Sequence, residues 1–119
     1  NLKLYNANAS SLLYSLQLGY YGYSGVMANF YPDLYVKLLN LDFNSKEAKR
    51  IENFLLITSY IEKQNYPKNA KYYMNNIEDI KINSYTRTLS NPLNDLEKLE
   101  IKSLKDLKND LISILEYAW

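Results

Sequence analysis

Short apolar runs and one helical pattern occupy the first 26 residues of the chain. Residues 2–5 form an apolar run with one charge, and small polar residues follow it, which predicts a strand that opens into a loop. Ser10 or Ser11 is placed to cap a helix carrying three leucines, and Gly19 stands where a glycine commonly ends a helix. Residues 21–26 predict a second strand. The predicted order is therefore strand, helix, strand.

The rest of the chain is free of glycine and has helical patterns. Pro32 favours the first turn of a helix over 33–41, and Pro67 does the same for a helix from Lys68 to about Asn76. The range 45–63 has apolar positions spaced three and four apart, which predicts an amphipathic helix through Ala48, Ile51, Leu55, Thr58 or Ile57, and Ile61.

The C-terminal region contains one further helix in the sequence pattern. Ser103 with Asp106 resembles a capping box, and an apolar stripe continues to Ala118. The stretch 80–101 is the least regular part, and Pro92 marks a loop in it. We therefore expect the last helix to begin near residue 103.

Composition limits the size and the chemistry of the domain. The chain has 119 residues, far fewer than the ~250 of a complete eight-stranded α/β barrel. It has neither cysteine nor histidine, so disulfides, thiolate metal sites and an imidazole base are excluded. The net charge of +1, without a basic block, does not indicate a nucleic-acid partner. We expect no cofactor and no bound metal.

The hydropathy pattern favours a soluble protein. Apolar runs stay well below membrane-spanning length, and the N-terminal residues have no basic leader or cleavage pattern. The lack of cysteine is compatible with a reducing environment, so we expect a cytoplasmic protein without a membrane partner. The first residue is Asn1, a weak indication that sequence precedes it.

Two parallel strands joined by a helix do not form a stable sheet by themselves. Both edges would carry unpaired backbone groups. The pattern therefore predicts that the chain is part of a larger fold or associates with another copy.

The segment from Gln17 to Pro32 resembles the late-barrel signature of the dihydrodipicolinate synthase and N-acetylneuraminate lyase family. It has a helix-ending glycine, a strand, and the pair Ala28-Asn29 before a helix that starts with proline. Weaker likenesses lie in the run Leu4-Tyr5-Asn6, in the segment from Tyr66 to Tyr73, and at Arg87, so the resemblance extends over nearly the whole chain.

The resemblance implies a mostly helical α/β chain, the C-terminal fragment of a TIM barrel. Residues 1–42 would be the last two strand and helix units, and residues 43–119 a C-terminal helical region. It also implies a lyase or aldolase that holds pyruvate or another 2-keto acid as a Schiff base on a lysine, assisted by a tyrosine. Both catalytic residues would lie upstream, so the chain alone is expected to be inactive and to need the missing N-terminal part of the barrel.

Active-site residues of such barrels come from the C-terminal ends of the strands. On this basis we expect Ala7, Ser24, Gly25 and Asn29 to line the substrate pocket. The family has a glycine at position 7 and uses the backbone carbonyl at position 24. Sialic-acid lyases place carboxylates at the positions of Ala9 and Ser10 and a serine at the position of Val26. All three are absent here, which disfavours sialic-acid cleavage. Ser24 and Asn29 could equally serve only to satisfy backbone groups at a strand end.

Other residues have structural interpretations. We interpret the tyrosines at 20, 21 and 23 as packing residues rather than as a platform on which a ligand stacks. We expect Lys71 and Arg87 to form ion pairs or to contact carbonyl oxygens rather than to take part in catalysis.

An alternative function is a non-catalytic helical protein-interaction module. For either function we expect homo-oligomers.

Overall fold

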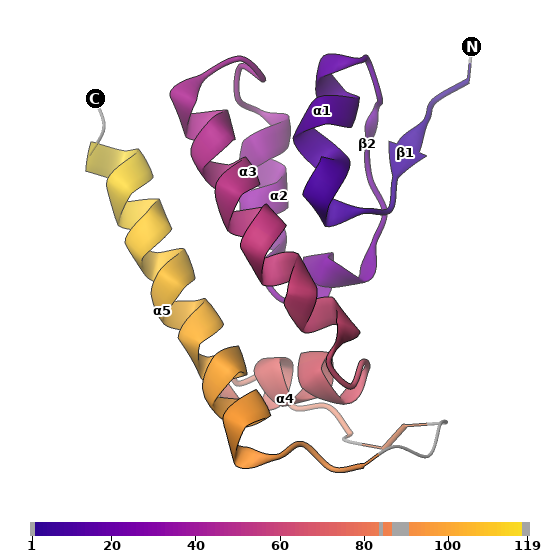
Figure 1. The fold of residues 1–119 in the computed structure, drawn as a ribbon, viewed down its shortest axis with the longest axis vertical. Coiled ribbons are helices and arrows are strands. Elements are labelled where there is room, and N and C mark those ends of the chain that lie inside the picture. The colour runs from indigo at the N-terminus through magenta and orange to yellow at the C-terminus, as the bar shows by residue number, and fades with distance from the viewer. Residues whose placement is uncertain (1, 84, 87–90, 118–119) are drawn as a thin grey trace. The chain divides into compact units, whose positions relative to one another are not determined.

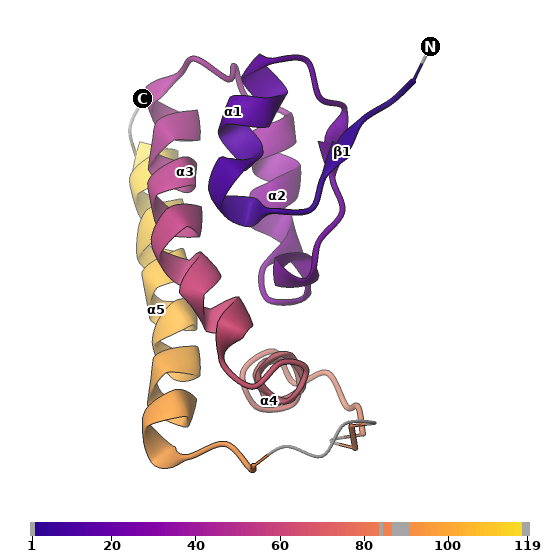
Figure 2. The same ribbon diagram turned by 45° about the vertical axis from the view of Figure 1, so that its right-hand side comes forward.

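The computed structural model describes residues 2–83, 85, 86 and 91–117 (Figures 1 and 2). This part of the chain is mostly helical, with five α-helices and a two-stranded parallel sheet. Two compact units, Asn1–Ser59 and Tyr60–Trp119, divide the chain. Their border lies beyond the division predicted after residue 42, and each unit is described separately below.

The sheet of the first unit consists of β1 (Tyr5–Asn6) and β2 (Gly22–Tyr23). The strands are parallel, with Tyr5 opposite Gly22 and Asn6 opposite Tyr23, which confirms the predicted pairing. Backbone hydrogen bonds extend the contact by one residue on each side, from Tyr21 N to Leu4 O (2.7 Å) and from Ser24 N to Asn6 O (2.8 Å). The ladder is shorter than the predicted strands, as expected for two strands that pair only with each other within the described residues.

Helix α1 (Leu12–Gln17) connects the two strands and buries Leu12, Leu13 and Leu16, as predicted. Gly19 has a φ of +100°, and Tyr20 N and Gly19 N donate to the carbonyl oxygens of Ser15 and Leu16. These two bonds are those of a Schellman motif, in which glycine adopts the left-handed conformation at lowest cost. Gly19 therefore ends the helix as the sequence predicted.

The start of this helical segment differs from the prediction. The short 3₁₀ helix η1 (Ala9–Ser11) precedes α1, and the side chain of Asn8 caps it by accepting from Ser10 N (3.0 Å). Ser11 occupies the N-cap position of α1 without a side-chain capping bond. Its hydroxyl accepts a hydrogen bond from Asn6 Nδ2 (3.1 Å).

Helices α2 (Pro32–Leu39) and α3 (Lys46–Thr58) complete the first unit, and η1 and α1 pack against α3. Pro32 begins α2, and the Ser45 side chain caps α3 by accepting from Ala48 N (3.1 Å), as the sequence indicated. The core contains large side chains that are almost fully buried, among them Leu12, Met27, Phe30, Tyr31, Leu34, Leu38, Ile51 and Leu55. The Tyr31 hydroxyl reaches Thr58 Oγ1 at 2.7 Å, which satisfies both buried groups.

The predicted helix over 45–63 is interrupted at Thr58, where η3 (Ser59–Lys63) takes over. Thr58 faces inward and Ile57 is exposed, which settles the alternative that the sequence left open. In the second unit, α4 (Lys68–Asn76) follows as predicted, and the buried Asn69 donates to Ile61 O (2.6 Å).

The last helix, α5 (Asp95–Tyr117), begins eight residues before the predicted start at Ser103, which was wrong. The capping box is formed by Asn94 and Glu97, since Asn94 Oδ1 accepts from Glu97 N (2.8 Å) and Glu97 Oε1 accepts from Asn94 N (3.1 Å). Ser103 lies inside the helix and donates to Leu99 O (2.9 Å).

A charged cluster links the end of α4 to α5. Glu78 Oε1 accepts from Lys105 Nζ at 2.9 Å and from the Tyr73 hydroxyl at 2.8 Å. Partial burial raises the pKa of Glu78, but these two hydrogen bonds and the charges of Lys105 and Lys108 outweigh it, so that its pKa is lowered. The carboxylate form therefore stabilises this part of the fold.

Candidate functional site at the ends of the parallel strands

The C-terminal end of β1 is held by the side chain of Asn6. Its amide nitrogen donates to the hydroxyl oxygens of Ser11 and Ser15, both at 3.1 Å, and its carbonyl oxygen accepts from Asn8 N at 2.8 Å. Ser15 in turn donates to Leu12 O (2.7 Å). These bonds connect the strand, the following turn and α1, and they fix the course of the backbone through Ala7.

Ala7 and Gly25 meet at this end of the sheet. A Cβ atom placed on Gly25 would lie 2.6 Å from the carbonyl oxygen of Ala7 and would also collide with the hydroxyl of Tyr23. Gly25 has an extended backbone, with φ of −152°, so glycine is required here by close approach and not by conformation. Two of the predicted pocket residues are therefore in direct backbone proximity.

The two remaining predicted residues are exposed. Ser24 lies between Tyr23 and Gly25, and its backbone N–H pairs with Asn6 O. Asn29 is at the end of the 3₁₀ helix η2 (Val26–Asn29), which starts directly after Gly25. Ala7, Ser24 and Gly25 thus share one edge, and Asn29 follows on the next helical turn.

The tyrosines near this edge contact other rings. Tyr23 stacks on Tyr35 of α2, with ring centroids 4.4 Å apart and planes inclined by 12°. Tyr21 meets Tyr5 edge to face at 5.4 Å, and Lys3 Nζ lies 4.6 Å from the centroid of the Tyr21 ring. Tyr23 packs against α2 as the sequence analysis favoured, whereas Tyr21 is 58% exposed.

A separate pocket of about 240 Å³ borders the same strand and α1. Polar side chains and one leucine line it: Asn6, Ser11, Tyr14, Ser15, Leu18 and Tyr20. The sequence did not predict it, since the residues come together only through the bonds of Asn6 to the helix. Those bonds already use the Asn6 amide and both serine hydroxyls of the wall, so the pocket offers weak chemistry.

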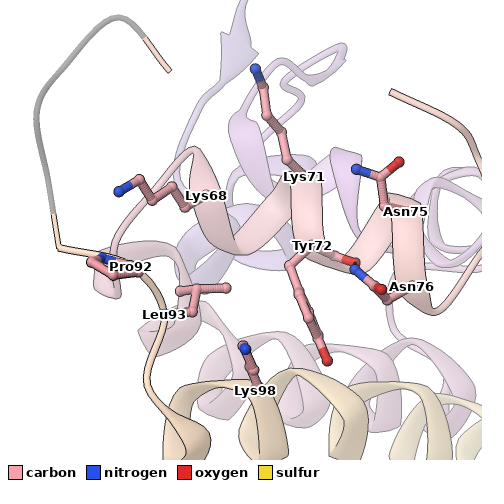
Figure 3. A pocket seen from close by; sticks show the side chains of 8 residues that line it. All are labelled: Lys68, Lys71, Tyr72, Asn75, Asn76, Pro92, Leu93 and Lys98. Carbon is pink, nitrogen blue, oxygen red and sulfur yellow. The ribbon is translucent and has the colours of Figure 1, made fainter. Parts of the chain in front are cut away.

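The second unit contains a pocket of about 300 Å³ beside α4 (Figure 3). Three lysines, Lys68, Lys71 and Lys98, contribute to its wall. Lys71 donates to the carbonyl oxygen of Tyr85, which confirms the carbonyl contact predicted for it. Arg87, for which a similar role was predicted, lies outside the described residues.

The described residues offer little for a metal or for membrane insertion. Within them, no group of three or more carboxylates could hold a metal ion. In the same part of the chain, every helix is too short or too polar to cross a bilayer.

Comparison with known proteins found no relative of this chain. A scan against protein-family models found no match, and searches of curated proteins and of solved structures found none either.

Proposed function

We propose that this chain is the C-terminal part of a Schiff-base-forming lyase or aldolase that acts on pyruvate or another 2-keto acid. In this proposal β1 and β2 are the last two strands of a TIM barrel. The chain supplies part of the pocket wall and the C-terminal helices, and the lysine and tyrosine that perform the chemistry precede it.

The observation that carries the proposal is the strand, helix, strand order with parallel strands, whose C-terminal ends bring Ala7 against Gly25. Barrel enzymes place their substrates at this end of the strands. An all-helical module has no need for a parallel pair or for a glycine held this closely.

The roles of the wall residues follow from their chemistry. A lysine amine in a desolvated pocket adds to the ketone of the substrate and forms a Schiff base with loss of water. The backbone carbonyl groups of Ala7 and Ser24 can accept hydrogen bonds from a bound substrate. The lack of carboxylates at positions 9 and 10 favours a small 2-keto acid over a sugar acid.

The complete gene product provides the test. Incubation with pyruvate and borohydride should add one reduced pyruvate to a single lysine encoded before Asn1, at the end of a strand, with a tyrosine at the end of the strand before it. An upstream sequence without that lysine and tyrosine, or a product that stays unmodified, would refute the proposal.

The helical interaction module remains the second candidate, since α5 exposes large apolar side chains. Leu96, Leu99, Leu107 and Ile114 are 62%, 61%, 50% and 45% exposed. Apolar surface of this kind is typical of protein contacts. The same gene product distinguishes the two functions, because an interaction module forms no adduct with pyruvate.

A further inference from the structure

Two lysines of α5 mark the side of this helix that faces α4. Lys98 lies beside Tyr72 of α4, with its Nζ 5.9 Å from the centroid of the ring (Figure 3). Lys105 Nζ lies 2.9 Å from Oε1 of Glu78, which directly follows α4. Residues of a helix advance by about 100° each, so both lysines lie on one side of α5. The opposite side of the helix faces away from α4.

This opposite side has the spacing of a seam along which two helices pair. Its positions alternate four and three residues apart, the repeat that keeps one helix in contact with another. Leu96, Leu107 and Ile114 are large, apolar and exposed, and the exposed Leu99 lies beside them. Ser103 is small, and its hydroxyl donates to Leu99 O, so it permits close approach. We define the seam by the residues Leu96, Glu100, Ser103, Leu107, Asp110 and Ile114.

Two carboxylates interrupt the apolar seam. Neither Glu100 nor Asp110 forms an ion pair with another residue that the structure describes. In the sequence, neither has a lysine or arginine three or four positions away, but each has an acidic neighbour at such a distance, Glu97 and Asp106 respectively. Like charges at this spacing are unfavourable in a helix. The seam would therefore gain from cations brought by a partner.

A second copy of the chain does not bring these cations to the seam. If two copies of α5 run antiparallel with Leu96 opposite Ile114, Glu100 of one copy lies opposite Asp110 of the other. If they run parallel and in register, each carboxylate meets its own counterpart. Both arrangements place like charges against each other across the contact, which disfavours self-pairing through this face.

We infer that the seam of α5 binds a basic amphipathic helix of a partner protein. Apolar side chains of the partner would cover the exposed leucines and isoleucine, and a lysine or arginine would lie opposite each carboxylate. Charged residues within such a seam select the partner at a cost in stability. The distance from Glu100 to Asp110 along the helix axis is about 15 Å, so the two basic residues of the partner should also be about ten positions apart.

This inference gives a partner to the interaction surface of α5, the second candidate function. It does not depend on the lyase chemistry, because no residue of the seam belongs to the ends of the strands. A complete gene product that forms no adduct with pyruvate would leave it standing.

Two synthetic helical peptides test the seam in the 119-residue chain. Both carry leucine at the seam positions and differ only at two of these positions, about ten residues apart, where one peptide has lysine and the other glutamate. Fluorescence anisotropy of the labelled peptides should show that the lysine peptide binds about tenfold more tightly, with an advantage that shrinks as salt is added. Equal affinities, or no binding of the lysine peptide, would overturn the inference.

Charge variants of α5 provide the matched pair. Glu100→Gln should weaken binding of the lysine peptide about twofold to fivefold, and Asp110→Asn repeats the test at the second carboxylate. Glu116→Gln makes the same change in charge at an exposed position outside the seam and should leave the affinity unchanged. Equal losses at positions 100 and 116 would indicate a diffuse charge effect and refute the seam.

Leu107→Ser separates a foreign partner from a second copy. It removes a half-exposed apolar side chain from the middle of the seam and keeps both carboxylates, so the core is not disturbed. The lysine peptide should bind this variant more weakly, while the mass of the free chain in light scattering should not change. A fall of that mass to the monomer value would show that a second copy covers the seam, and the inference would be wrong.

Discussion

Replacing Gly25 by alanine tests the close approach at the ends of the strands. The added methyl group would stand 2.6 Å from the carbonyl oxygen of Ala7 and against the Tyr23 hydroxyl. The carbonyl belongs to a turn held by Asn6, and the Tyr23 ring is stacked on Tyr35 at 4.4 Å. Neither neighbour can move without loss of other contacts.

The expected cost follows from two opposing effects. Overpacking of this kind costs about 1–3 kcal/mol, and a backbone partner places this position in the upper half of that range. Alanine reduces the freedom of the unfolded chain and returns about 0.4–1 kcal/mol, since its extended backbone suits any residue. We therefore expect Gly25→Ala to lower the free energy of unfolding by about 2 kcal/mol.

Urea unfolding followed by far-UV circular dichroism measures this change, and Gly22→Ala is the matched control. A Cβ atom on Gly22 would lie 3.3 Å from the Cε1 atom of Tyr5, a half-exposed ring that can shift. The control should change the free energy of unfolding by no more than about 0.5 kcal/mol. A Gly25→Ala protein as stable as the control would show that the strand ends are not packed as described.

Four further predictions concern the second unit and the whole chain. Glu78→Gln should cost up to about 1 kcal/mol at neutral pH. Because the folded pKa of Glu78 lies below its ordinary value of 4.5, this stabilisation is complete above that value and disappears as the pH falls through the folded pKa. Unfolding in urea at pH 7 and at pH 3 checks this, with the exposed Glu116→Gln as control. Asn94→Ala should lower the free energy of unfolding by about 1 kcal/mol through loss of the capping box, and Ser103→Ala should have a smaller effect in the same assay. The 119-residue chain should gain no mass from pyruvate and borohydride, whereas a stoichiometric adduct on one lysine would contradict an upstream catalytic residue. Light scattering at low micromolar concentration should give a mass above 14.0 kDa, because the described strands pair only with each other, and a clean monomer would contradict the argument from open edges.

Elements with strong local signals were predicted well from the sequence. Gly19 ends α1, Pro32 starts α2 and Ser45 caps α3, since each acts through its own backbone conformation or a bond to a residue three positions away. The parallel pairing of β1 and β2 also follows from a connection too long for a hairpin.

The beginning of α5 was missed because two capping patterns compete in the sequence. Ser103 precedes a clean apolar stripe, whereas the first turns after Asn94 carry Leu96 and Leu99, both largely exposed. Apolar periodicity favours the later start. The reciprocal hydrogen bonds between Asn94 and Glu97 start the helix at the earlier position. The sequence pattern alone does not show which of the two capping boxes forms.

Pockets depend on contacts between distant segments, which periodicity does not reveal. The pocket beside α4 also includes Pro92, Leu93 and Lys98, which belong to the range 80–101, where the sequence has no regular apolar pattern. That Ala7 and Gly25 share one edge was expected only through the barrel resemblance, and the tightness of their contact depends on the position of the Tyr23 hydroxyl.

The bonds of Asn6 have a consequence for how this surface tolerates mutation. One amide fixes the turn after β1 to α1, so the carbonyl oxygen of Ala7 is positioned by residues that do not themselves face a ligand. A wall built from main-chain oxygens keeps its shape when the side chain at position 7 changes. Mutation is therefore expected to be tolerated at position 7 and restricted at Asn6, where even the isosteric Asp would remove the donor to both serines.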